Sequence, residues 1–348
     1  MRAPGFWLPG GGGLAPFLLT PVSALYARAT ARRVARAGWT APVPVICCGN
    51  VTAGGAGKTT VALDLIARLA AAGVGAHALL RGYGGSARGP LRVDPARHDS
   101  RVVGDEALLL ADLAPTWVGA DRAETARRAV ADGAGAIVMD DGLQNPTLEK
   151  TLALLVIDGT FGFGNGRVIP SGPLREPVAA AAARAHAAVL IGDDETGATR
   201  LLPDHLPVLR ARLVPGPGTS SLAGRPVLAF AGIANPRKFF DTLAEAGAII
   251  VGRQTFADHY PYDDADIALI LAEAEKLAAV PVTTRKDIVR VPPRFRDGIA
   301  VAGIGLAWED EVALTALLAP HLPPLRPAAQ ALPAGTSDPT TDTATCTA

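Results

Sequence analysis

The sequence contains little cysteine, and its few cysteines are poorly placed for cross-links. Three cysteines occur among 348 residues, and none has the Cys-x-x-Cys spacing of a metal site. Cys47 and Cys48 are adjacent within an apolar run, and neighbouring side chains of a strand point to opposite faces, so these two thiols cannot easily pair. The sequence therefore excludes a disulfide-rich scaffold and indicates buried thiols in a reducing cytoplasm.

The sequence also lacks an excess of charge of either sign. Lys plus Arg and Asp plus Glu number 33 each. A protein that binds nucleic acid by general electrostatic attraction carries a basic excess, so we expect no nucleic-acid partner. Apolar residues make up 49% of the chain, which is typical of globular proteins, and the length allows two domains.

The N-terminal segment, residues 1–40, has no charged residue between Ala3 and Ala27. Its prolines and the run Gly10 to Gly13 would repeatedly break a membrane-spanning helix. An apolar stripe beside an arginine stripe instead predicts an amphipathic helix in the headgroup region of a membrane, and the alternative is a helix packed on the main domain. The apolar residues of this pattern are Phe17, Leu18, Val22, Leu25 and Tyr26, and the arginines are Arg28, Arg32, Arg33 and Arg36.

Strand-like and helix-like segments alternate through residues 41–218. This alternation predicts a parallel sheet covered on both faces by helices. A helix is expected over about 58–72, and two more begin near Asp105 and Asp121. Expected strands are 43–48, 77–80, 116–119, 136–139 and 152–157.

A cluster of proline and glycine at 214–224 separates a second series of elements. We expect residues 219–324 to form a second, smaller α/β domain. The tail, residues 325–348, has few large apolar side chains and is expected to be disordered. Expected strands of the smaller domain are 227–231, 249–254, 280–283 and 299–303, and its clearest helices are 239–246 and 265–277.

A glycine-rich loop that follows an apolar strand and opens a helix predicts a nucleotide site of the P-loop type. Its glycines let backbone N–H groups face phosphates, Lys58 would reach the β- and γ-phosphates, and Thr59 would hold Mg²⁺. The usual first glycine is replaced by Thr52, and the extra lysine of dimeric ATPases is replaced by Ala53. The alternative is a glycine-rich turn with an incidental lysine. The predicted ATP-binding residues are Thr52, Ala53, Gly54, Gly55, Ala56, Gly57, Lys58 and Thr59.

Two carboxylates, Asp140 and Asp141, end an expected strand. In parallel α/β sheets the carboxyl ends of the strands face the ligand. The two acids are therefore candidates for holding Mg²⁺ opposite Thr59, and the alternative is that they only cap a turn.

Several further motifs, in this order and spacing, resemble the tetraacyldisaccharide 4′-kinase family, the lipid A kinases of Gram-negative bacteria. The resemblance covers roughly residues 14–320. It implies a P-loop NTPase-like fold and ATP-dependent phosphorylation of the 4′-hydroxyl of an acylated disaccharide 1-phosphate, giving a lipid IV-A type product. It also implies peripheral contact with anionic membrane at the cytoplasmic face of the inner membrane. The motifs are Arg81 to Gly85, Gly104-Asp105-Glu106, Asp140 to Gln144, Gly162 to Gly166, Pro173 to Pro177, Phe230 to Ile233, Phe256 to His259 and Thr283 to Asp287.

The resemblance also implies roles for individual residues. Asp105 is the candidate catalytic base and His259 its partner, whereas the local pattern alone makes Asp105 a helix N-cap. Surface ion pairs are the alternative for the two arginines at 122 and 175. Further candidate metal ligands are Glu106 and Glu176, and candidate substrate contacts are Arg122, Gln144, Asn165 and Arg175.

The sequence departs from the family pattern in places, and one other class of function fits the loop. A P-loop switch or maturation ATPase/GTPase is the main alternative, but Arg285 stands where a guanine-binding motif has lysine. A non-enzymatic scaffold would leave the acids at 105, 140 and 141 unexplained. The departures from the family are Ala107, Leu143, Asn145, Tyr260 and Arg285.

Overall fold

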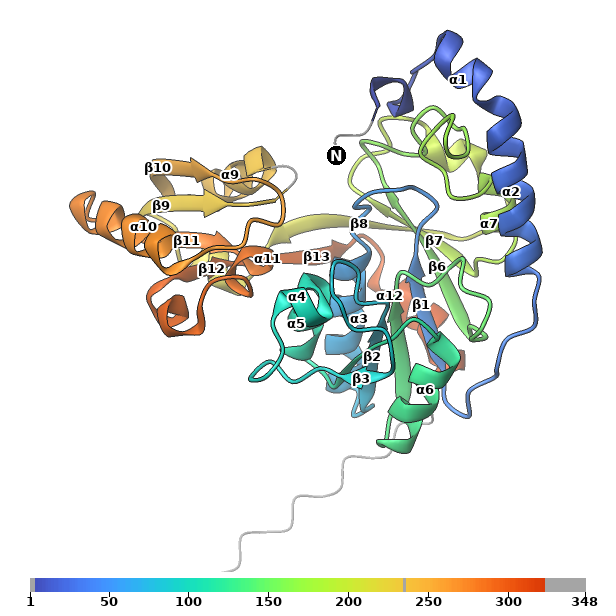
Figure 1. Ribbon diagram of the computed structural model, residues 1–348, viewed down its shortest axis with the longest axis horizontal. Coiled ribbons are helices and arrows are strands. Elements are labelled where there is room, and N and C mark those ends of the chain that lie inside the picture. Colours follow the sequence, from blue (N-terminus) through green and yellow to red (C-terminus); the bar gives the residue numbers. More distant parts are fainter. Residues whose placement is uncertain (1–3, 234–235, 323–348) are drawn as a thin grey trace, which may run out of the picture.

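Two β-sheets organise the chain (Figure 1). The computed structural model describes residues 4–233 and 236–322, so the predicted disordered tail, 325–348, lies outside the described residues. The larger sheet has nine strands in the order β13-β8-β7-β6-β1-β5-β2-β4-β3, and the smaller has four in the order β10-β9-β11-β12. This mixed α/β arrangement, with a large mainly parallel sheet, confirms the predicted fold class.

The centre of the larger sheet is parallel. Strand β1 (Val45–Gly49) pairs in parallel with both β5 (Ala136–Asp140) and β6 (Leu152–Asp158). The carboxyl ends of these strands therefore meet at one edge of the sheet, which brings the loop after β1 beside the acids that end β5. The other strands of this sheet are β2 (Ala76–Leu80), β3 (Leu91–Arg92), β4 (Thr116–Val118), β7 (Ala187–Ile191), β8 (Val208–Pro215) and β13 (Ile304–Trp308).

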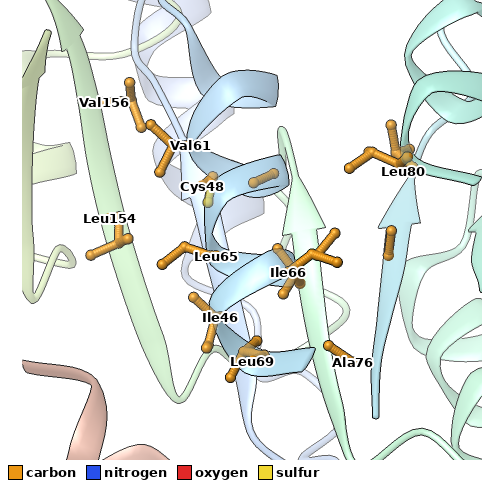
Figure 2. Close-up of a cluster of buried hydrophobic side chains, with 14 of the residues drawn as sticks. Ile46, Cys48, Val61, Leu65, Ile66, Leu69, Ala76, Leu80, Leu154 and Val156 are labelled. Carbon is orange, nitrogen blue, oxygen red and sulfur yellow. The ribbon is translucent and has the colours of Figure 1, made fainter. Parts of the chain in front are cut away.

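Helix α3 (Lys58–Ala71) covers one face of the central strands (Figure 2). Its apolar side chains recur at helical spacing and pack against Ile46 and Cys48 of β1 and Leu154 of β6. Cys47 belongs to a separate core cluster on the opposite face, so the two adjacent cysteines are both buried and free, as predicted. The α3 side chains in this contact are Val61, Leu65, Ile66 and Leu69, each at most 1% exposed.

Further helices surround the larger sheet. Helix α6 has Asp121 as its N-cap, whose side chain accepts hydrogen bonds from the N–H groups of Ala123 and Glu124, which explains the predicted start of this helix. The helices are α4 (Ser100–Val103), α5 (Asp105–Ala111), α6 (Arg122–Ala131), α7 (Val178–Ala182) and α12 (Glu311–Leu318).

The smaller sheet is inserted between two neighbouring strands of the larger one. The chain leaves through β8 and returns through β13, which pairs antiparallel with β8 (Figure 1). The elements between them are α8 (Pro217–Ser220), β9 (Pro226–Ala231), α9 (Pro236–Glu245), β10 (Ile249–Thr255), α10 (Asp264–Lys276), β11 (Val280–Thr284), α11 (Arg285–Ile288) and β12 (Ala300–Ala302).

The predicted end of the smaller domain, at residue 324, is wrong. Strand β13 joins the larger sheet, and Leu314 of α12 is buried in the core of that sheet. The Trp308 indole N–H donates to Asp64 of α3 at 2.9 Å, and Arg68 of α3 forms an ion pair with Glu311 at 2.6 Å. The smaller unit therefore ends before β13, because which sheet a strand joins is decided by distant pairing that a local pattern does not contain.

The N-terminal segment forms two consecutive helices, α1 (Leu14–Leu18) and α2 (Thr20–Val34), along the outside of the larger sheet (Figure 1). Small polar residues face the protein: the buried Ser23 hydroxyl donates to Ser171 at 2.8 Å. The predicted apolar stripe points outward, with Phe17 67% exposed and Leu25 65% exposed. No helix in residues 4–233 and 236–322 combines the length and apolarity needed to cross a bilayer.

Candidate active site

The glycine-rich loop connects β1 to the N-terminus of α3, as the motif predicts. Gly57 precedes the helix in a left-handed conformation with φ of 83°, and a Cβ there would lie 2.5 Å from the side chain of Ile191. The left-handed backbone favours glycine, and a Cβ would in addition require the Ile191 side chain to move. Gly54 and Gly55 are exposed, whereas the Ala53 N–H already donates to the Pro173 carbonyl at 2.8 Å. The open part of the loop therefore begins after Ala53.

Thr59 and Asp140 meet at the end of β5. The Thr59 hydroxyl donates to Oδ2 of Asp140 at 2.8 Å, while Oδ1 of Asp140 is buried without a hydrogen-bond partner. Burial, and then the negative charge of Glu106, raises the pKa of Asp140 to about 7. A buried carboxylate with a free oxygen is stabilised by a cation, so this pair fits the one or two protein ligands that Mg²⁺ uses beside phosphates.

Asp141 is held by cations instead. Nη1 of Arg175 lies 2.7 Å from its Oδ1, and Nζ of Lys58 lies 3.9 Å from its Oδ2. Burial opposes the ionisation of Asp141, but Lys58 and Arg175 outweigh it and hold the pKa of Asp141 below its ordinary value. Asp141 also has a positive φ of 57°, a backbone conformation that is uncommon for residues other than glycine.

Glu176, a predicted metal ligand, is engaged elsewhere. Both of its oxygens accept hydrogen bonds from Arg184 at 2.8 Å, and the Gln144 amide donates to one of them at 2.9 Å. In the part of the chain that the structure describes, no three His, Cys, Asp or Glu side chains form a metal-binding cluster. The cation site that the geometry supports is thus Thr59 with Asp140, and metal ligation by Glu106, Asp141 and Glu176 stays a prediction.

The predicted base and its partner are brought together from the two sheet units. Nδ1 of His259, in the loop after β10, lies 2.7 Å from Oδ2 of Asp105 at the start of α5. This hydrogen bond raises the pKa of His259 above its ordinary value. The alternative that Asp105 is a helix N-cap is wrong. Gly104, with φ of 87°, is the N-cap of α5, and Asp105 is the first residue of that helix.

Two predicted substrate contacts form structural hydrogen bonds. The Asn165 amide donates to the carbonyls of Phe6 and Ser171 at 2.7 and 2.9 Å, so it joins the N-terminal segment to the glycine-rich turn at 162–166. The Arg122 guanidinium is buried and donates to the Gly119 carbonyl, and its Nε has no hydrogen-bond partner. Burial lowers the pKa of Arg122 to about 10. Contact of Asn165 and Arg122 with substrate stays a prediction.

Three residues that sequence analysis did not select also organise the site. The backbone carbonyl of Asn50 accepts a hydrogen bond from the Gln144 amide, and Arg184 forms an ion pair with Glu176. Arg290, on the smaller unit, has its Nε 3.3 Å from Oδ2 of Asp105. Of these three residues, only Arg290 could have been selected from the sequence, because it lies three positions after the Thr283 to Asp287 motif.

The fold and the site together define an enzyme of the P-loop NTPase-like class, with a phosphate loop, an acid at the end of a neighbouring strand and a carboxylate–histidine pair. The chain belongs to the family of tetraacyldisaccharide-1-P 4′-kinases, whose model matches residues 15–322. This confirms the resemblance seen in the sequence motifs.

Relatives with this name cover nearly the whole chain. The tetraacyldisaccharide 4′-kinase of Gluconacetobacter diazotrophicus is 57% identical over 91% of this chain and 97% of that protein. The one from Rhodospirillum centenum is 53% identical over 92% and 97%. Among solved structures, LpxK from Aquifex aeolicus in complex with ATP superposes with a TM-score of 0.73 at 24% identity, covering 89% of this chain and 100% of that one, which supports the fold.

Proposed function

We propose that this chain transfers the γ-phosphate of ATP to the 4′-hydroxyl of a tetraacyldisaccharide 1-phosphate in lipid A biosynthesis. The observation that carries the proposal is the 2.7 Å contact between Asp105 and His259. A P-loop protein that only binds or slowly hydrolyses nucleotide has no need of a carboxylate–histidine pair assembled from two sheet units. A kinase needs a residue that orients the hydroxyl of a second substrate, and this pair can supply it.

On this proposal each part of the site has a separate task. The loop from Gly54 to Thr59 binds the triphosphate, and Lys58 stabilises charge on the transferring oxygens. Thr59 and Asp140 would hold Mg²⁺, which when bound neutralises charge on the β- and γ-phosphates. Two features of Asp140 support this cation site: its Oδ1 is buried without a hydrogen-bond partner, and the pKa of its carboxyl group is raised.

Asp105 accepts the proton of the acceptor hydroxyl. The hydroxyl oxygen attacks the γ-phosphorus as the bond to the leaving oxygen of ADP breaks, and the hydroxyl proton passes to the Asp105 carboxylate. His259 contacts Oδ2 of that carboxylate, so its positive charge offsets the repulsion between Asp105 and the phosphates. Proximity and charge neutralisation, rather than a strong base, are the main requirements of this reaction.

Mass spectrometry of the product tests this function directly. Incubation with ATP and a tetraacyldisaccharide 1-phosphate should give a product with one added phosphate, at the 4′-position, and one ADP for each product formed. A nucleotide-driven switch would instead release phosphate at the same slow rate with and without the lipid. Acceptor-independent hydrolysis with no phosphorylated lipid would reject the kinase assignment.

We also propose that α1 and α2 place the enzyme peripherally on the cytoplasmic face of the inner membrane. The outward apolar side chains include Leu14, 72% exposed, and Phe17, 67% exposed. The four arginines at 28, 32, 33 and 36 are exposed on the same segment. Apolar side chains entering the acyl boundary beside arginines at the headgroups are the features of an interfacial helix. A lipid substrate held in the bilayer would then be within reach of the site.

Replacing Arg28, Arg32, Arg33 and Arg36 with glutamine should weaken binding to anionic vesicles by about 1 kcal/mol per site at low salt, as attraction to anionic headgroups is lost. Added salt should reduce the difference, because exposed charges are screened. Co-sedimentation with vesicles measures the effect. Glutamine at the exposed Arg97 and Arg101, 82% and 86% exposed, is the matched control. Equal binding by the fourfold variant and this control would favour a helix that only packs on the protein.

A further inference from the structure

Arg290 is a buried cation at the contact between the two sheet units. It follows α11 of the smaller unit, and its side chain is 4% exposed. Its Nε lies 3.3 Å from Oδ2 of Asp105, which belongs to α5 of the larger unit. A charge removed from water to this extent interacts more strongly with its partners than an exposed charge does.

The Arg290 guanidinium is fixed on several sides by the smaller unit. Nη1 donates to the carbonyls of Gly232 at 3.1 Å and Tyr260 at 3.2 Å, and Nη2 donates to Oδ1 of Asp287 at 3.1 Å. Asp287 is fully buried and accepts further hydrogen bonds from the Thr284 hydroxyl and the Tyr262 hydroxyl. Nε donates to the carbonyl of Lys286 at 3.1 Å, so its 3.3 Å contact with Asp105 is an ion pair. A planar group held at this many points has one orientation, which keeps its charge beside Oδ2 of Asp105.

Arg290 and His259 contact the same oxygen of Asp105. Both reach Oδ2, and in the part of the chain that the structure describes no hydrogen bond ends on Oδ1. This arrangement leaves Oδ1 as the oxygen that can face an acceptor hydroxyl. The two cations differ, however, because the His259 side chain is 58% exposed and charged only when protonated, whereas arginine is charged at every working pH.

The other charged groups around Asp105 do not replace Arg290. Glu106 is the next residue on α5 and forms an ion pair with Lys286 of α11 at 3.4 Å. Asp258 adds negative charge beside His259. Asp287 faces Arg290 from within the smaller unit. Arg290 is therefore the one permanently charged group of the described residues that forms an ion pair with Asp105.

We propose that Arg290 is a positioning residue for phosphoryl transfer, which fixes Oδ2 of Asp105 and so leaves Oδ1 to face the acceptor hydroxyl. The inference rests on the proposed kinase function and assigns it one more residue. Arg290 acts through Asp105 and does not touch substrate. Since Arg290 comes from the smaller unit, the base is correctly oriented only when the two units are in contact.

The test compares Arg290→Gln with Arg290→Lys. Gln should lower kcat by about 10²-fold, since a small displacement of a reacting group is enough for such a loss. KM for ATP should stay within twofold of the wild type, because Arg290 does not contact the phosphate loop. Arg290→Lys should recover part of the loss in kcat, because it restores a cation beside Oδ2 of Asp105. It should stay several-fold below the wild type, since lysine has no planar fork.

Arg296→Gln is the matched control. Arg296 braces the same segment by donating to the carbonyls of Val291 at 2.9 Å and Val289 at 2.8 Å, and it does not contact Asp105. This variant should lose thermal stability while keeping the kcat of the wild type. If Arg290→Gln does not fold, kcat of Arg290→Lys alone tests the proposal. A kcat equal to that of the wild type in this variant would overturn it.

The outcomes also separate this inference from the function on which it rests. Wild-type enzyme that forms no 4′-phosphorylated lipid rejects the function. If the wild-type enzyme is active but Arg290→Gln loses no more kcat than Arg296→Gln, or acts mainly by raising KM for ATP, the role of Arg290 is overturned and the function is left standing.

Discussion

Replacing Lys58 with alanine is expected to lower kcat by ~10²–10³, the usual loss when one preorganised donor to transition-state charge is removed. Lys58 is the first residue of α3, and its side chain, 10% exposed, has its Nζ 3.9 Å from Oδ2 of Asp141. This ion pair holds its ammonium group at the loop. Because the buried face of α3 begins at Val61, the variant should remain folded.

Steady-state kinetics with saturating lipid, together with a thermal melt, measure the two effects separately. Lys276→Ala, at the exposed end of α10, is the matched control for loss of a lysine and should keep wild-type kcat. Near-normal phosphorylation of lipid by Lys58→Ala would show that the phosphate loop has been assigned to the wrong residues.

The second large effect is expected at Asp105 and His259, which should behave as one unit. Each alanine substitution should lower kcat strongly, by about 10²–10⁴-fold, the usual range for general acid–base groups. The double variant should be little worse than the poorer single variant, since residues that act together give non-additive losses. Their 2.7 Å contact links the two sheet units, so removing either residue breaks the same pair.

A double-mutant cycle on kcat, with acceptor saturating, measures this coupling. ATP affinity should change less than in Lys58→Ala, because neither residue holds the triphosphate. The hydrogen bond to Asp105 raises the pKa of His259 above 6.5, so the charged pair is complete below pH 6.5 and is lost as pH rises through the raised value. The loss caused by His259→Ala should therefore shrink at alkaline pH. Strictly additive losses would exclude a dyad.

Local sequence patterns predicted that the glycine-rich loop and the two acids lie at the carboxyl ends of strands. The loop before Lys58 follows β1, Asp140 ends β5 and Asp141 follows it, and parallel pairing of β1 with β5 brings them together. The hydrogen bond between Thr59 and Asp140 joins positions 81 residues apart, yet it follows from the strand order alone. The pairing of Asp105 with His259 needed the family resemblance, because 154 residues and two sheets separate them.

Other features depend on contacts that no local pattern contains. The sequence does not predict that Arg184 forms an ion pair with Glu176 or that the Asn165 amide donates to the Phe6 carbonyl. Each is a single contact between common polar groups, with no pattern around it. Strand β7 follows an alanine-rich stretch, whose helix-forming tendency hides the strand. The expected smaller domain, 219–324, includes the residues of β13 because they directly follow that domain's last expected strand, whereas β13 pairs in the larger sheet.

The return of the chain through β13 has a consequence for the order of events during synthesis. The residues that complete the larger sheet are translated after the whole of the smaller unit, whose four-stranded sheet can fold as soon as β12 leaves the ribosome. Until then, Asp64 and Arg68 on the phosphate-loop helix lack Trp308 and Glu311, their partners in the finished protein. A chain truncated before residue 304 and released from the ribosome should therefore hold a protease-resistant smaller unit beside a nucleotide helix that is still open to cleavage.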